Sequence, residues 1–255
     1  MSLETIKTAL TKACTQAGRN PDDVTLIAVS KTHPPEKIAP LLEAGHRVFG
    51  ENRVQEAQSR WGETFADKRE GLELRLIGPL QTNKAEDAAA LFDVIETLDR
   101  EKLLKALLKA ADKIGRLPRL YVQVNTGEED QKSGVFPNDL PAFLKRLISE
   151  YDITPEGLMC IPPAPEAAAP HFWLLNKLAM EHGLSVLSMG MSNDFETRMK
   201  TFFNNSSASL SKAYHNSKSW TTQKLLSFSK WMYHKLAQSQ IRELDRLENQ
   251  EIQNL

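Results

Sequence analysis

Cysteine is scarce in this sequence: Cys14 and Cys160 are the two among 255 residues, and no Cys-x-x-Cys spacing occurs. Such a chain offers neither a zinc knuckle nor a redox pair. Long apolar runs are also missing, because none approaches the roughly 18 residues of a membrane span and no apolar leader precedes the first helical pattern. We therefore expect a cytoplasmic protein that contacts no membrane and keeps both cysteines in its core.

The charge of the chain is nearly balanced, with 32 basic and 33 acidic side chains. A formal net charge of −1 gives no general attraction to nucleic acid or to an acidic membrane surface, so we expect neither as a partner. The length of 255 residues suits one large α/β domain or two small ones.

Strand and helix patterns alternate through the first three quarters of the chain. Apolar residues at helical spacing predict a first helix with Ser2 as its N-cap, ahead of the first strand. Short apolar runs then predict buried parallel strands at 25–30, 46–49, 74–77, 92–97, 120–125, 157–161 and 184–189. Helical patterns follow at 35–44, 55–61, 84–91, 100–114, 139–150 and 167–182. Seven such units favour an α/β TIM-type (β/α)8 barrel, with an open doubly wound sheet as the competitor.

This alternation ends near residue 200. Nine serines lie between residues 201 and 240, against eight in all the residues before 200, and no eighth strand of comparable quality appears. We therefore divide the chain into a barrel at 1–199, which lacks its regular eighth strand, and a divergent tail at 200–255 that is serine-rich and then helical. Residues 223–254 are expected to form an amphipathic helix, which packs on the barrel or contacts a partner.

Lys31 stands where the first predicted strand meets Thr32, His33 and two prolines. An amine in that position is suited to form a Schiff base with an aldehyde cofactor or substrate, although a solvated lysine that ends a strand is the plain alternative. Functional groups of a parallel barrel gather at the carboxyl ends of its strands. Those ends carry polar segments at 31, 50–53, 78–84, 96–97, 125–127 and 188–194.

The loop after the seventh predicted strand is suited to bind an anion. Gly190 allows the backbone to approach a ligand, and Ser192 opens a helix whose first amides and hydroxyl face outward. An ordinary N-capped helix is the alternative. A Schiff-base lysine opposite a phosphate site would suit pyridoxal 5'-phosphate (PLP).

Several segments resemble the signature blocks of a known family. They are AVSK (28–31), FGENRVQE (49–56), IGPLQTNK (77–84), VNT (124–126) with KSG (132–134), GLM (157–159), and LSMGMS (187–192) with DF (194–195). In this order, over about residues 1–199, they are similar to the blocks of the pyridoxal phosphate homeostasis proteins, the YggS and PROSC group. The resemblance implies a barrel like the N-terminal domain of alanine racemase that binds PLP.

The same resemblance implies roles for individual residues. Lys31 is then the Schiff-base lysine, Asn52 lies near the cofactor, and Ser192 is among the phosphate ligands, with Met189 and Gly190 in the same cofactor-binding set. Family members are regarded as carriers or regulators of vitamin B6 and amino-acid pools, with no firmly established reaction. We expect that function here, with PLP as the small-molecule partner and with no metal.

Two other functions stay open. A PLP-dependent racemase or lyase needs a second acid or base on the opposite cofactor face, normally a tyrosine from a further domain, and Tyr214 and Tyr233 lie in a segment without a β-domain pattern. The third alternative is a barrel inactivated by its C-terminus. The family's strand of the form V-R-[IV]-G-[ST], which closes the barrel and completes the phosphate cup, is absent after Thr197, so we expect weaker cofactor binding.

Overall fold

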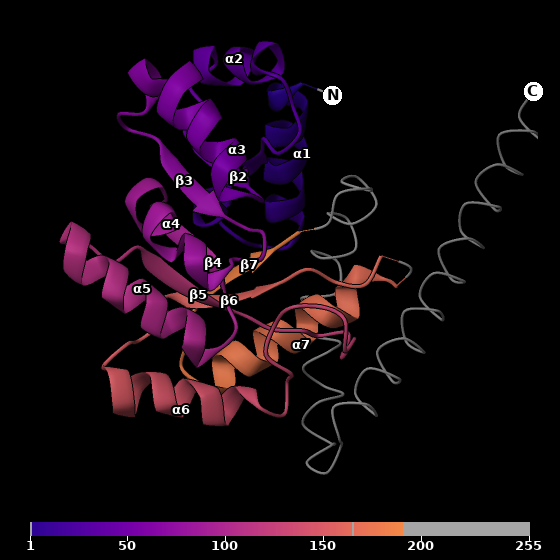
Figure 1. The fold of residues 1–255 in the computed structure, drawn as a ribbon. Helices are drawn as coiled ribbons and strands as arrows, with labels where there is room; N and C mark the ends of the chain where they lie inside the picture. Colours follow the sequence, from indigo (N-terminus) through magenta and orange to yellow (C-terminus); the bar gives the residue numbers. More distant parts are fainter. Residues whose placement is uncertain (1, 165, 191–255) are drawn as a thin grey trace, which may run out of the picture.

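The computed structural model describes residues 2–164 and 166–190, which form a single parallel sheet of seven strands (Figure 1). The strands are β1 (Ala28–Val29), β2 (Val48–Glu51), β3 (Glu73–Leu76), β4 (Val94–Leu98), β5 (Arg119–Gln123), β6 (Gly157–Cys160) and β7 (Val186–Met189). Each strand pairs with the next one along the chain, so the sheet order equals the sequence order. All seven predicted strands are therefore confirmed, with small shifts in their bounds.

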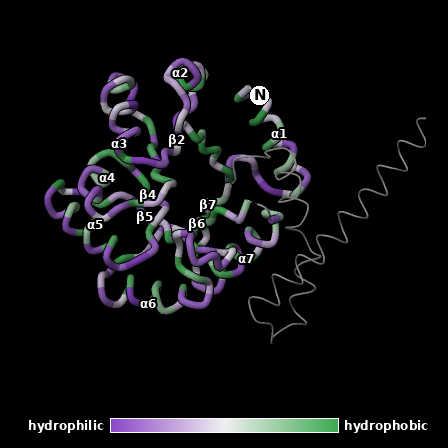
Figure 2. The backbone as a smooth tube through the Cα atoms, turned by 45° about the vertical axis from the view of Figure 1, so that its right-hand side comes forward, coloured by the Kyte–Doolittle hydropathy of each residue, from purple (hydrophilic) through white to green (hydrophobic). Residues whose placement is uncertain are grey.

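One helix precedes β1 and the others follow strands, and the helices lie around the outside of the sheet (Figure 2). They are α1 (Leu3–Gln16), α2 (Pro35–Glu43), α3 (Val54–Ala57), α4 (Ala85–Leu91), α5 (Glu101–Ile114), α6 (Leu140–Tyr151) and α7 (Ala168–Glu181). The expected N-cap of the first helix is confirmed, since the Ser2 hydroxyl accepts a hydrogen bond from the Thr5 amide. Within the described ranges, no helix is both long enough and apolar enough to cross a membrane.

The sheet is curled into a barrel. Its sequential order is wrong for a doubly wound sheet, in which the strand order reverses at a switch point. The Ser188 hydroxyl on β7 donates to Glu96 on β4 over 2.6 Å, although β5 and β6 lie between these strands. In a flat sheet, strands three places apart would be roughly 14 Å from each other. The contact crosses the interior of a curled sheet, which confirms the TIM-type barrel.

The first and last strands are the edges of the described sheet. Between residues 2 and 190, β1 pairs with β2 alone and β7 pairs with β6 alone. The predicted absence of an eighth strand, the division of the chain at residue 200 and the helix at 223–254 all concern residues 191–255 in part or in full. These three predictions lie outside the described residues.

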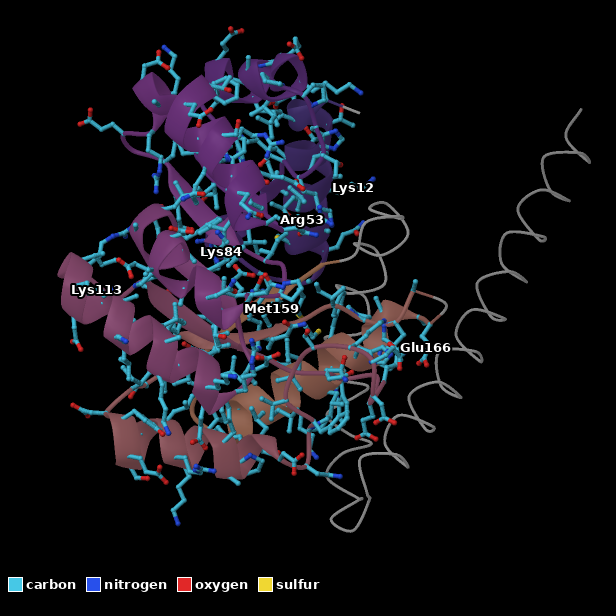
Figure 3. The ribbon with its side chains drawn as sticks, in the orientation of Figure 1. Lys12, Arg53, Lys84, Lys113, Met159 and Glu166 are labelled. Atoms are coloured by element: carbon cyan, nitrogen blue, oxygen red, sulfur yellow. The ribbon has the colours of Figure 1, made fainter. Side chains whose placement is uncertain are left out.

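Apolar side chains fill the space between the sheet and the helices, and the barrel interior is partly polar. The fully buried outer layer includes Phe49, Leu76, Ile95, Leu104 and Leu107. Inside, the Arg75 guanidinium lies 5.7 Å from the ring centroid of Tyr121, and Met159 is buried with Val94 and Tyr121 near the centre (Figure 3). Cys14 and Cys160 are free and buried, as expected.

Two elements differ from the sequence prediction. The predicted strand at 25–30 is paired only at Ala28–Val29, because residues 25 and 26 run past the start of β2 in the observed register. The helix predicted at 55–61 is α-helical only through Ala57 and continues as a π-helix over Gln58–Thr64. This π-helix carries Arg60 and Trp61, which both reach the end of β2.

Candidate functional site

Four of the five residues expected to bind the cofactor lie at one edge of the sheet. Lys31 follows β1, Asn52 follows β2, and Met189 and Gly190 end and follow β7. Because all strands are parallel, these are carboxyl ends that share one rim of the barrel. Lys31, Asn52 and Met189 are half-buried and Gly190 is exposed. Ser192 lies outside the described residues.

Lys31 occupies a tight turn directly after β1. The Ser30 amide donates to the carbonyl of Gly50 over 2.9 Å, which continues the strand ladder, and the His33 amide donates back to the Ser30 carbonyl over 3.2 Å. Thr32 has a φ of 60°, a left-handed conformation that is uncommon for a β-branched residue. Lys31 is therefore presented by a strained four-residue turn rather than by a free loop.

Glu51 joins this turn to the π-helix. Its carboxylate is fully buried, and its Oε1 accepts hydrogen bonds from Ser30 Oγ (2.7 Å), Arg60 Nη1 (2.6 Å) and Trp61 Nε1 (2.9 Å). Arg60 also donates from Nη2 to the carbonyl of His33 over 3.1 Å. The other carboxylate oxygen, Oε2, is buried without a protein partner. Such a set of donors offsets the cost of burying a carboxylate.

Asn52 is held by its backbone. Gly78, in the loop after β3, packs so closely on it that a side chain at position 78 would overlap the Asn52 carbonyl. The position of Asn52 at the rim is thus fixed by contact between two backbones, and only glycine at 78 allows that contact.

At the rim near β7, hydrogen bonds to one buried carboxylate join β7 to β4 and β3. Glu96, which is fully buried, accepts from Ser188 on β7 and, over 2.9 Å, from Arg75 on β3. Burial lowers the pKa of Arg75, but the carboxylates of Glu96 and Glu73 outweigh that effect and leave it above its ordinary value. At Gly190, a Cβ would meet no atom within 4 Å. The described part of the rim thus carries the Lys31 amine, the Asn52 side-chain amide and the exposed backbone of Gly190.

Comparisons with known proteins show the family of this chain. The model of the family "Alanine racemase, N-terminal domain" matches residues 2–204. A pyridoxal phosphate homeostasis protein from Pseudomonas aeruginosa is 41% identical over 192 residues, which cover 72% of this chain and 81% of the relative. One from Aquifex aeolicus is 37% identical over 198 residues, which cover 74% and 86%. The chain belongs to the pyridoxal phosphate homeostasis protein family.

The fold of this chain is also similar to that of solved structures. PipY from Synechococcus elongatus, solved without PLP, has a TM-score of 0.63 at 35% identity, covering 77% of this chain and 94% of PipY. PipY with PLP bound has a TM-score of 0.60 at 33% identity, covering 78% and 99%. An alanine racemase from Clostridium difficile, at 17% identity and a TM-score of 0.54, shares the fold; the match covers 76% of this chain and 51% of the racemase.

Several other polar residues at the rim of this protein are paired with neighbouring residues of the same chain. Arg53 is exposed and pairs with Glu56, and Lys84 pairs with Asp87 in the next helix. The Asn125 amide group donates to the carbonyl of Glu129 in its own loop over 2.8 Å. These contacts are local, so these residues have structural roles in their own loops and helix starts.

The loops after β5 and β6 enclose a buried polar cluster. His171 on α7 contacts the Thr126 hydroxyl through Nδ1 (3.1 Å) and Glu166 through Nε2 (3.2 Å). Burial raises the pKa of the neighbouring Cys160 thiol to about 12, against a lowering effect of its hydrogen bond with Thr126. A thiol with that pKa is not a nucleophile at neutral pH. Within the described ranges, no group of three or more His, Cys, Asp or Glu side chains could hold a metal ion.

Sequence reasoning missed Ser30, Glu51 and Arg60 as parts of the site. The sequence predicts a strand that ends at Phe49 and a polar rim segment at 50–53 that includes Glu51. The sequence feature that points to Glu51 is its position between the apolar residues Phe49 and Val54. A carboxylate that is buried there requires a basic partner nearby.

Proposed function

We propose that this protein binds PLP at the carboxyl ends of its strands and acts in the homeostasis of this cofactor (vitamin B6) and of amino acids in the cytoplasm. The observation that carries the proposal is the position of Lys31, which a strained and hydrogen-bonded turn holds at the same rim as Asn52 and Gly190. Membership of a family whose relatives are named for pyridoxal phosphate homeostasis supports it, as does the PLP-bound structure of PipY.

The residues of this chain take separate roles in the proposal. Bound PLP supplies an aldehyde, which condenses with a primary amine with loss of one water molecule. Lys31 provides that amine, and its neutral form is the one that attacks a carbonyl. Asn52 and Met189 flank the ligand at the rim. Gly190 and Ser192 bind the phosphate through a close backbone approach and a hydroxyl group.

Neither of the two described tyrosines lies at the rim, and Tyr214 and Tyr233 are outside the described residues. Tyr121 is buried beside Arg75, and its register partner Gly157 is the first residue of β6, at the opposite end of the strand from the rim. Tyr151 on α6 donates to Glu101 on α5, outside the barrel. A racemase or lyase therefore stays the alternative, to be tested by turnover of amino acids in the loaded protein.

Reductive trapping tests the proposal. The purified protein with added PLP should show a near-visible absorption band, and borohydride followed by peptide mapping should locate the adduct on Lys31. Lys31→Ala should lose both signals, whereas Lys37→Ala, a control in α2, should keep them. An adduct found on other lysines, or no band at all, would contradict the proposal; the latter outcome is expected of a barrel inactivated by its C-terminus.

A further inference from the structure

The turn that carries Lys31 needs support from outside its own strand. β1 contributes two residues to the sheet and pairs with β2 alone in the described chain, so the ladder ends at the Ser30 amide and does not reach Lys31. Thr32 adopts a positive φ without the freedom of glycine. Such a conformation persists only where surrounding contacts determine it.

One buried ion pair supplies these contacts on both sides of Lys31. Glu51 accepts from the Ser30 hydroxyl, directly before Lys31, and Arg60 donates to the carbonyl of His33, two residues after it. Glu51 and Arg60 also bind each other over 2.6 Å, with their side chains 0% and 12% exposed. The pair therefore connects both ends of the turn to β2 and to the π-helix.

Stability alone does not account for an ion pair in this place. Burying two charges costs much of what their attraction returns, and apolar replacements of such pairs are often neutral or stabilising. An apolar pair could not make the two directional hydrogen bonds that hold Ser30 and His33 on either side of Lys31. The planar guanidinium of Arg60 suits this task because it presents separate donors to Glu51 and to His33.

We infer that Glu51 and Arg60 are positioning residues that hold the Lys31 turn ready for covalent attachment to an aldehyde. The inference rests on the proposed role of Lys31. A reactive group held in its productive orientation reacts without first losing conformational freedom. Loosening the turn should therefore weaken covalent binding of the aldehyde and leave the rest of the ligand site intact.

Two ligands separate positioning from general damage. PLP carries the aldehyde, whereas 4'-deoxypyridoxine 5'-phosphate has a methyl group in its place and binds without covalent attachment. In Ser30→Ala and in Arg60→Lys, we expect the affinity for PLP to fall about tenfold, the equivalent of one hydrogen bond to a charged group. The affinity for the deoxy analogue should stay within about twofold of the unmodified protein.

The control is Ser59→Ala, which removes an exposed hydroxyl from the same π-helix and should change neither affinity. Equal losses for both ligands, or no loss for PLP, would overturn the inference. Ser30→Ala removes only one oxygen atom, so it provides the test even if Arg60→Lys fails to fold. Borohydride mapping of the unmodified protein separates the two proposals: an adduct on Lys31 with unchanged variant affinities contradicts the positioning role alone, and an adduct elsewhere contradicts both.

Discussion

Gly78 packs against the backbone of Asn52 with no room for a side chain: a Cβ at position 78 would lie 2.2 Å from the Asn52 carbonyl oxygen and 2.6 Å from its Cα. The two residues follow neighbouring strands, β3 and β2, and both lie in the rim of the barrel. Backbone atoms cannot rotate away from such an overlap as the end of a flexible side chain can.

Gly78→Ala should therefore displace Asn52. We expect a loss of about 1–3 kcal/mol in the free energy of unfolding, together with weaker PLP binding. Gly62→Ala is the matched control, since a Cβ at position 62 meets nothing within 4 Å. Urea denaturation and PLP titration measure the two effects. A Gly78→Ala protein as stable as Gly62→Ala would show that the rim adapts to the added methyl group.

Ser188→Ala should loosen β7. The substitution removes one of the donors to the buried carboxylate of Glu96, so we expect a loss of about 1–3 kcal/mol in the free energy of unfolding. Ser185→Ala, at an exposed position before the same strand, should change stability by less than about 0.5 kcal/mol. Equal denaturation midpoints for the two variants would contradict a tether across the barrel.

His46 should make the barrel less stable in mild acid. Burial lowers the pKa of His46 below its ordinary value of 6.5, while its hydrogen bond to the Val48 carbonyl and the charges of Lys7 and Arg47 have smaller effects. The unfolded chain then binds more protons than the folded chain as the pH falls through 6.5, so stability decreases by up to about 1.4 kcal/mol per pH unit. Melting temperatures between pH 7.5 and about 5 should fall less in His46→Gln. The same slope in both proteins would assign the effect to other groups.

Ser192 should contribute to the affinity for the phosphate group of PLP and not to the affinity for its pyridine ring. Ser192→Ala should weaken PLP binding by about 1–2 kcal/mol, the range for a hydrogen bond to a charged group, and should affect pyridoxal much less. Titrations with both ligands provide the measurement, and Ser185→Ala serves as the control. Equal losses for PLP and pyridoxal would place the phosphate elsewhere.

The strands could be predicted from the sequence because each is a short apolar run in a parallel sheet buried on both faces. Their ends could not. β2 was predicted to end at Phe49 but continues to Glu51, because Arg60 and Trp61 satisfy a carboxylate that alone would belong in a loop. The contacts that extend the strand come from residues nine and ten positions later, so no local pattern contains them.

For the candidate site too, the sequence predicts some features and not others. Lys31 and Asn52 could be placed at the rim, because the carboxyl ends of parallel strands share one edge. The positive φ of Thr32 and the overlap between Gly78 and Asn52 depend on tertiary packing, which periodicity does not report. The roles of all five residues in binding, Lys31, Asn52, Met189, Gly190 and Ser192, stay predictions.

The short ladder of β1 has a consequence for how a cofactor could be taken up and released. A segment opens locally at a free energy set by the contacts it must break. Apart from the bonds of Glu51 and Arg60 to its turn, β1 has only two ladder residues, fewer than any other described strand. Amides at 28–33 should therefore exchange hydrogen with solvent sooner than those of β4, whose five residues are all buried. Covalent loading at Lys31 would slow that exchange, and release would need only this segment to open while the remaining strands stay folded.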